Sequence, residues 1–119
     1  MWKGLILALL LLPSASTAEA QTIKLQTGQD LLRLCRAFNG ATEPDPLELG
    51  ICMGYVQGVV GGAYTLARNN VFCMPHTATI QDGVMAVVRY LNANPQELRY
   101  TAPSLVLAAM KVAYPCAGR

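Results

Sequence analysis

The chain has 119 residues, a formal net charge of +2 and 53% hydrophobic residues, with 13% charged residues. This charge balance is too mild to indicate nucleic-acid binding. The basic residues also stand singly, without a polybasic run or interleaved aromatic residues. The length predicts a single domain.

The first twenty residues have the three parts of a secretory signal peptide. Lys3 supplies a positive charge, residues 5–12 form an unbroken apolar run, and residues 18–20 place alanines where a signal peptidase cleaves. The apolar run is too short to cross a bilayer, which takes about 20 residues. We therefore expect a signal peptide over residues 1–20 and a mature domain over residues 21–119. The expected location is the periplasm, with no membrane attachment after cleavage and with secretion past an outer membrane as the alternative.

The mature domain begins with a predicted helix over residues 28–38. Thr27 is its expected N-cap and is followed three residues later by Asp30, a capping-box arrangement with Asp in place of Glu. Apolar residues then recur at helical spacing. Residues 40–46 contain two prolines and predict a loop, in which Asp45 is the expected cap of the next helix.

The second predicted helix, over residues 47–69, is rich in glycine. Four of its glycines recur every fourth residue, at positions 50, 54, 58 and 62. Each glycine costs about 1 kcal/mol relative to alanine within a helix. We therefore expect a buried central helix whose backbone is closely approached by a neighbour. A transmembrane helix with a glycine dimerisation face is one alternative, although Gln57 interrupts the apolar run. A soluble dimer formed through the same face is another.

Two further helices complete the prediction. Thr79 and Asp82 repeat the capping-box pattern before a helix that is expected to end within residues 92–94. Residues 94–97 combine a cap, a proline and an acid, which predicts a short helical turn. The last helix is expected over residues 102–113. No segment alternates like a strand for long. The predicted fold class is therefore all-α, a small bundle of four main helices plus a short helical turn.

The four cysteines predict that this bundle is stapled by disulfide bonds. An even number of cysteines in a short exported chain indicates a disulfide framework rather than a metal cluster or a catalytic thiol. Three pairings are possible. We favour Cys35–Cys52, which joins the first two helices, and Cys73–Cys116, which ties the loop after the second helix to the C-terminus.

The sequence lacks a catalytic or cofactor-binding constellation. His76 is the single histidine, and Cys73-x-x-His76 has no second metal half-site when the cysteines are oxidised. No Gly-x-Ser-x-Gly elbow accompanies it. The acids Asp30, Asp82 and Glu97 fit helix starts better than a catalytic pair. We therefore expect a protein that is not an enzyme and that holds no cofactor and no metal.

Five motifs occur together along the mature chain: Cys52-Met53-Gly54-Tyr55-Val56-Gln57-Gly58-Val59, Phe72-Cys73-Met74-Pro75, Ile80-Gln81, Asn94-Pro95 and Tyr114-Pro115-Cys116. This combination, which covers about residues 29–116, resembles the Rap/Tai family of type VI secretion amidase immunity proteins. The resemblance implies a small helical periplasmic protein, often a homodimer. Such a protein binds a peptidoglycan amidase effector and inhibits it.

The resemblance supplies no contact residues that can be carried over to this chain. We therefore take candidate effector-binding residues from three expected loops, at residues 39–45, 69–76 and 92–100. Arginine and tyrosine are frequent anchors of protein interfaces. The candidates are Glu43, Asp45, Asn70, His76, Arg99 and Tyr100.

Two other classes of protein fit a small, exported, helical and disulfide-stapled chain. An HdeA-like periplasmic acid-stress chaperone should dissociate and expose apolar surface at low pH. The sequence shows no evident cluster of carboxylates that would trigger such a change. An envelope protein of unknown role is the remaining alternative.

Overall fold

The computed structural model describes Ser14, residues 23–66 and residues 71–117. Apart from Ser14, the predicted signal peptide lies outside these residues. The described part contains four α-helices and two short 3-10 helices, with no strand: α1 (Gly28–Leu34), η1 (Arg36–Phe38), α2 (Pro46–Leu66), α3 (Ile80–Ala93), η2 (Pro95–Glu97) and α4 (Ala102–Ala113). The all-α prediction is confirmed.

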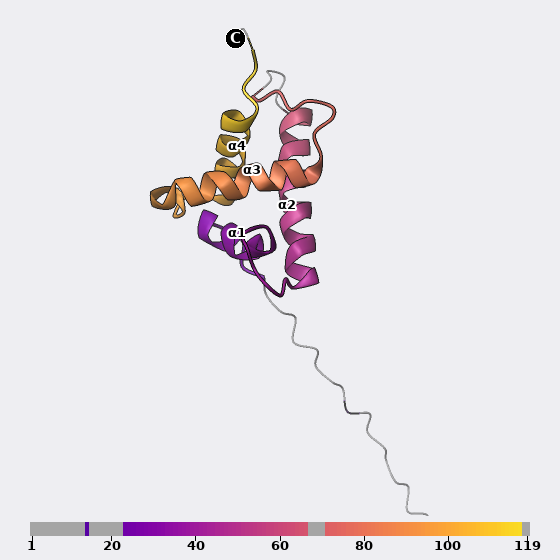
Figure 1. Ribbon diagram of the computed structural model, residues 1–119, viewed down its shortest axis with the longest axis vertical. Helices are drawn as coiled ribbons and strands as arrows, with labels where there is room; N and C mark the ends of the chain where they lie inside the picture. Colours follow the sequence, from indigo (N-terminus) through magenta and orange to yellow (C-terminus); the bar gives the residue numbers. More distant parts are fainter. Residues whose placement is uncertain (1–13, 15–22, 67–70, 118–119) are drawn as a thin grey trace, which may run out of the picture.

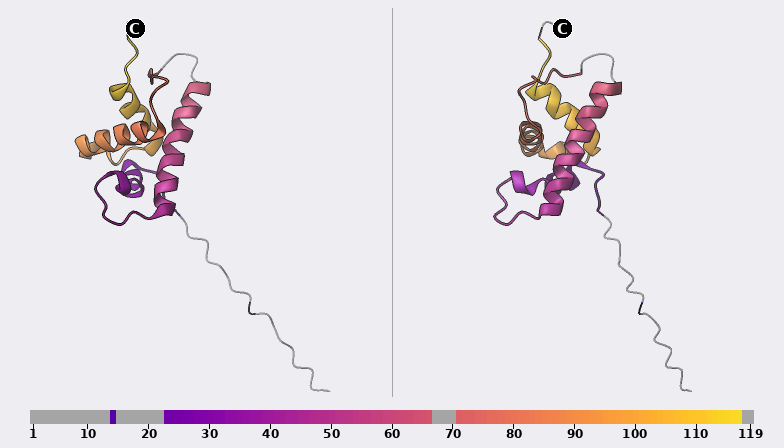
Figure 2. Two further views of the ribbon diagram at one scale, coloured as in Figure 1. Left: turned by 45° about the vertical axis from the view of Figure 1, so that its right-hand side comes forward. Right: turned by 90° about the vertical axis from the view of Figure 1, so that its right-hand side faces the viewer.

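Three of the helices, α1, α3 and α4, pack together against the fourth, α2. Figure 1 shows α3 crossing both α2 and α4, with α1 lying beyond it. In the left view of Figure 2, α1, α3 and α4 lie on one side of α2, which runs along the edge of the bundle. Contacts join α2 to each of the other three helices, and the most extensive contact is between α3 and α4. One face of α2 is therefore covered by the bundle, and the rest of its circumference faces outward.

Local capping begins α1 and α3 where the sequence predicts. The Thr27 hydroxyl accepts a hydrogen bond from the Asp30 N–H over 3.3 Å, and the Asp30 carboxylate accepts one from the Thr27 N–H over 3.1 Å. Thr79 and Asp82 form the same reciprocal pair, with distances of 3.1 and 2.8 Å. Both capping boxes satisfy backbone donors that a helix start leaves open.

The first helix is shorter than predicted. α1 ends at Leu34, and after Cys35 the chain continues as η1 rather than as an α-helix to Phe38. The N–H of Phe38 donates to the carbonyl of Cys35, the i to i+3 pattern that tightens a helix end. Gly40 follows with a φ of 82°, which suits glycine and turns the chain toward α2.

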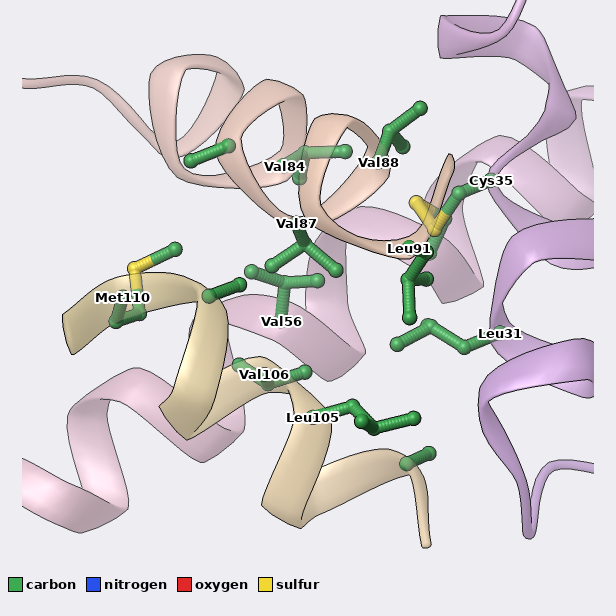
Figure 3. Close-up of a cluster of buried hydrophobic side chains, with 14 of the residues drawn as sticks. Leu31, Cys35, Val56, Val84, Val87, Val88, Leu91, Leu105, Val106 and Met110 are labelled. Atoms are coloured by element: carbon green, nitrogen blue, oxygen red, sulfur yellow. A yellow bond between two sulfur atoms is a disulfide. The ribbon is translucent and has the colours of Figure 1, made fainter. Parts of the chain in front are cut away.

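Apolar side chains from all four helices form the core. Figure 3 shows Val56 of α2 and Val87 of α3 pointing toward one another, with Leu31 and Leu91 beside them. None of the buried residues in the described ranges is polar or charged. The larger buried side chains of the core are those of Leu31, Leu34, Val56, Phe72, Val84, Val87, Leu91, Leu105, Val106 and Met110.

Two disulfides staple this core, in the pairing that we favoured from the sequence. Cys35 bonds to Cys52 and Cys73 bonds to Cys116, with Cα atoms 5.1 and 4.8 Å apart. The first bond is fully buried and joins the end of α1 to α2. The second lies nearer the surface and ties the loop after α2 to the segment after α4.

The position of α2 differs from the prediction of a buried central helix. Cys52 and Val56 are its buried residues, and a Cβ added at Gly50, Gly54 or Gly58 would meet nothing within 4 Å. The expected close approach to these glycines is wrong, because the other helices pack on a different face of α2. By length and hydropathy α2 is also a candidate membrane span, with 11% of its most apolar window buried.

Candidate protein-binding surface

The structure separates the three loops that supplied the predicted binding residues. The loop of residues 39–45 precedes α2 and the segment from residue 71 follows it, so a helix of about 30 Å divides them. The end of α3 lies near the first loop, because the Asn92 side-chain amide donates to the Asn39 side-chain oxygen over 2.8 Å. The candidates therefore do not form one continuous site.

Three of the candidates make contacts within the domain. The Asp45 carboxylate accepts the N–H of Leu47 over 2.8 Å and caps α2, as the sequence predicts. The Arg99 guanidinium lies 5.3 Å from the centre of the Tyr100 ring and donates to its hydroxyl. This hydrogen bond raises the pKa of Arg99. Both side chains of this pair are exposed, so they are available to a partner.

The remaining candidates lie apart from this pair. Glu43 is exposed in the loop before α2, whereas Asn70 lies outside the described residues. His76 is exposed and lines a pocket of about 360 Å³. The hydroxyl of Tyr64 on α2 accepts the N–H of Met74 over 3.0 Å, which holds the His76 loop against that helix.

A small apolar hollow lies beside the His76 pocket, between α2 and the start of α3. It has a volume of about 120 Å³, and Val56, Val60 and Met74 are among its lining residues. This space is too small for more than a short side chain. It extends the apolar character of the surface around the C-terminal half of α2.

Two arginines hold the single acid of α2. Arg36 Nη2 lies 2.7 Å from Glu48 Oε2, an ion pair whose geometry is not that of a hydrogen bond. Arg33 Nη1 contacts Oε1 over 3.5 Å. The Glu48 side chain is 19% exposed and both arginines are about half exposed. This cluster joins α1 and η1 to α2 next to the buried disulfide, and its role is structural.

A hollow with a mostly apolar lining lies where α3 crosses α4, and we refer to it as the α3–α4 notch. It has a volume of about 450 Å³. α3 contributes one side and α4 the other. The lining residues are Ala86, Arg89, Tyr90, Ala93, Asn94, Ala109, Val112 and Ala113. Ala93 and Asn94 fall within the predicted loop of residues 92–100. The other lining residues were not expected to be near a binding surface.

A sequence signal for the notch exists in the spacing of small residues. Ala86 and Ala93 are seven residues apart on α3, and Ala109 and Ala113 are four apart on α4, so each pair lies along one helix face. The crossing of the two helices brings these faces together. That crossing is a tertiary feature, and the sequence pattern alone does not specify it.

The described residues therefore form a small, disulfide-stapled helical domain with exposed loops and shallow hollows. Among the described residues, no group of three or more His, Cys, Asp or Glu side chains is placed to hold a metal ion. Residues 27–116 match the family described as Rap1a immunity proteins, and the chain belongs to this family. No curated protein and no solved structure matches the chain.

Family membership settles the broad class. The match spans the region from the Thr27 cap to Cys116, which includes all four helices and both disulfides. Immunity proteins of this family are not catalytic, so the chain is not an enzyme. The family also implies binding to a cognate toxin. Together with the family, the two disulfides indicate a location outside the cytoplasm.

Proposed function

We propose that the mature domain is a periplasmic immunity protein that binds and inhibits a peptidoglycan amidase delivered by a type VI secretion system. The family match over residues 27–116 carries this proposal. The physical character of the domain supports it. Two disulfides and a wholly apolar core give a rigid scaffold, and a rigid scaffold loses little conformational entropy when it binds.

Export of the domain is a part of the proposal that can be tested directly. Signal-peptide cleavage after Ala20 would leave Gln21 as the first residue of the mature chain. Mass spectrometry of the protein recovered from the periplasm should find this N-terminus. Recovery of the full-length chain in the inner membrane would contradict cleavage.

The decisive experiment is protection of living cells. The cognate amidase that this proposal requires is directed to the periplasm of a host strain, where it should lyse the cells. Co-expression of residues 1–119 should restore growth. Co-expression of residues 21–119, without an export signal, should not. Lysis in the presence of the exported chain would contradict the proposed function.

Inhibition should also be visible with purified components. The mature domain should bind the same amidase with nanomolar affinity, on the order of 12 kcal/mol of binding free energy. It should abolish release of cleaved peptides from isolated peptidoglycan. A version of the domain reduced and alkylated under denaturing conditions is the control, because it has the same composition without the folded scaffold. Undiminished amidase activity at a saturating concentration of the folded domain would contradict the proposal.

We further propose that the domain forms a homodimer through the outward face of α2. Gly50, Gly54 and Gly58 leave open space on this face. No charged residue lies between Glu48 and the end of the helix at Leu66, which is 84% exposed. A two-fold axis places a surface against its own copy, so an uncharged face avoids like-charge repulsion. A row of glycines permits close approach of two helices.

Sedimentation equilibrium tests the dimer. The mature domain should sediment as a dimer, and Gly58→Leu should sediment as a monomer because its side chain fills the open row. Gln96→Leu on η2 is the matched control, since it adds the same side chain at an exposed site far from α2. A monomeric wild-type domain would exclude this dimer.

A further inference from the structure

The α3–α4 notch has an apolar floor and an open rim. Ala86 and Ala109 form its floor and are 5% and 1% exposed. Arg89, Ala93 and Ala113 are exposed around it, and Val112 is 71% exposed. An isolated exposed apolar residue is ordinary on a protein surface, but a hollow lined by several is a candidate contact site.

The polar groups of the notch, except one, already have partners. The Tyr90 hydroxyl donates to Glu97 Oε2 over 2.6 Å, which raises the pKa of Tyr90. The Asn94 side-chain amide donates to the carbonyl of Tyr90 over 2.8 Å. Arg89 has no hydrogen bond or ion pair with any residue in the described ranges. Its guanidinium is therefore the polar group of the notch that is free to meet a ligand.

Arg89 differs from the acidic residues of the described helices, each of which has a partner within the domain. Asp30 and Asp82 are held in capping boxes, Glu48 by two arginines, and Glu97 by Tyr90. The acids of the described helices thus serve the fold, whereas Arg89 does not. A cation beside an apolar hollow favours an occupant that carries both an apolar group and a carboxylate.

We propose that the α3–α4 notch binds a protruding segment of the toxin that presents an aliphatic or aromatic side chain next to an aspartate or glutamate. This inference rests on the proposed function. The apolar side chain enters between the alanines of α3 and α4, and the carboxylate pairs with the Arg89 guanidinium. Such an anchor resembles the buried apolar contacts with a charged rim that dominate many protein interfaces.

The shape and charge of the notch argue against two other occupants. A second copy related by a two-fold axis would present the same hollow and the same Arg89, so neither hollow would be filled and two cations would face each other. A small molecule generally needs several convergent polar groups and an enclosing wall. Here one guanidinium is free and the rim is exposed. A convex segment of another protein matches these features.

Isothermal titration calorimetry with the catalytically inactivated cognate amidase tests the inference. Arg89→Glu should weaken binding by roughly 30-fold or more, as expected for loss of an interface anchor. Lys111→Glu is the matched control, because it makes the same charge change on α4 at an exposed residue outside the notch. It should bind within about threefold of wild type, as rim charges generally do.

A second pair of variants tests the hollow independently of the charge. Ala93→Phe fills the notch from an exposed position and should weaken binding to a similar degree. Ala117→Phe is its control, since Ala117 is exposed and lines no part of the notch. All variants should keep the helical circular-dichroism spectrum and thermal unfolding midpoint of the wild type. Binding is compared only between variants with the same folded fraction, because unfolding would itself reduce binding.

The outcomes separate the inference from the proposed function. If the wild type binds the amidase and both Arg89→Glu and Ala93→Phe bind equally well, the inference is wrong while the proposed function stands. If the wild type itself fails to bind, both fall together. If Arg89→Glu changes the sedimentation of the domain alone, a second copy occupies the notch and the inference is overturned.

Discussion

The N–H of Gly28 donates a hydrogen bond to the carbonyl of Tyr100 over 3.0 Å. This bond joins the first turn of α1 to the residue just before the Thr101 cap of α4. It is reinforced by a bond from the Gln29 N–H to the Leu98 carbonyl, also 3.0 Å. A Cβ added at Gly28 would lie 3.1 Å from Leu98 Cα and would collide with the Leu105 side chain. Close approach of two backbones therefore requires glycine at this position.

We expect Gly28→Ala to destabilise the domain by roughly 1–3 kcal/mol, because the added methyl group overpacks a contact made by backbone. Gly54→Ala should do the opposite and stabilise the monomeric domain by about 1 kcal/mol, since alanine favours helix and no atom lies in the space. Urea denaturation of both variants measures the two effects. Equal stability of the two alanine variants would contradict this account of the glycines.

The two disulfides should differ in their resistance to reduction. Cys35 and Cys52 are completely buried, whereas Cys73 is exposed and Cys116 is half-buried. Dithiothreitol without denaturant should therefore reduce Cys73–Cys116 first. Alkylation followed by peptide mass mapping gives the order. Simultaneous loss of both bonds would indicate that reduction requires global unfolding.

Removal of each disulfide should also reduce the free energy of unfolding. The bonded cysteines are 17 and 43 residues apart. The chain-entropy model assigns about 3 kcal/mol to a loop of the first size and about 4 kcal/mol to the second. The double variants Cys35→Ser/Cys52→Ser and Cys73→Ser/Cys116→Ser can be compared by urea denaturation. Because burial adds a packing cost to the first pair, that variant should lose more than its loop length predicts.

The two capping boxes should make stability depend on acid pH. Backbone N–H donors of Gln26 and Thr27 lower the pKa of Asp30, and the N–H of Thr79 lowers that of Asp82 below the usual 3.8. A lowered pKa in the folded state means that the unfolded chain binds protons first. The stabilisation is therefore complete above pH 3.8 and is lost as the pH falls through the lowered values.

Asp82→Asn should test this dependence. The variant should be less stable than wild type at neutral pH, and the difference should shrink as the pH falls below 3.8. Glu43→Gln, which removes an exposed carboxylate from a loop, is the control and should track the wild type at each pH. Urea denaturation across the acid range gives the comparison. A constant difference between Asp82→Asn and wild type would show that the carboxylate charge is not responsible.

The ion pairs of Glu48 should contribute little to stability. Arg33 and Arg36 are about half exposed, and such pairs are worth about 0.2–1 kcal/mol. A double-mutant cycle of Arg36→Ala and Glu48→Gln should give a coupling energy within this range, smaller at high salt. Coupling that is large and independent of salt would show that solvent around the two arginines does not screen these pairs.

Features with local causes could be predicted from the sequence. A capping box needs residues three apart, so Thr27 and Asp30 define the start of α1 without the rest of the fold. α4 has the predicted bounds for a similar reason, because a proline in its first turn and one after its end limit it. The favoured disulfide pairing could also be predicted, because the predicted ends of the helices indicate which cysteines lie close together.

The packing of α2 could not be predicted from the sequence in this way. Apolar residues occur on all sides of this helix, so no apolar stripe distinguishes the buried face from the face with the glycine row. The expected neighbour at the glycine row is absent, and Cys52 and Val56 form the inner face instead. α3 has a polar side and an apolar side; on the apolar side Val84, Val87, Val88 and Leu91 are buried, whereas Ile80 is exposed.

By itself, the sequence determined the helices, their caps, the disulfide framework and the resemblance to a family of immunity proteins. Only the tertiary structure decided which face of α2 is open, and which arginine lies beside a hollow without a partner among the described residues. The physical reason is the distance along the chain over which each interaction acts. Capping and helical periodicity act over a few residues, whereas the α3–α4 notch exists because two helices cross and bring Arg89 and Val112 to one place.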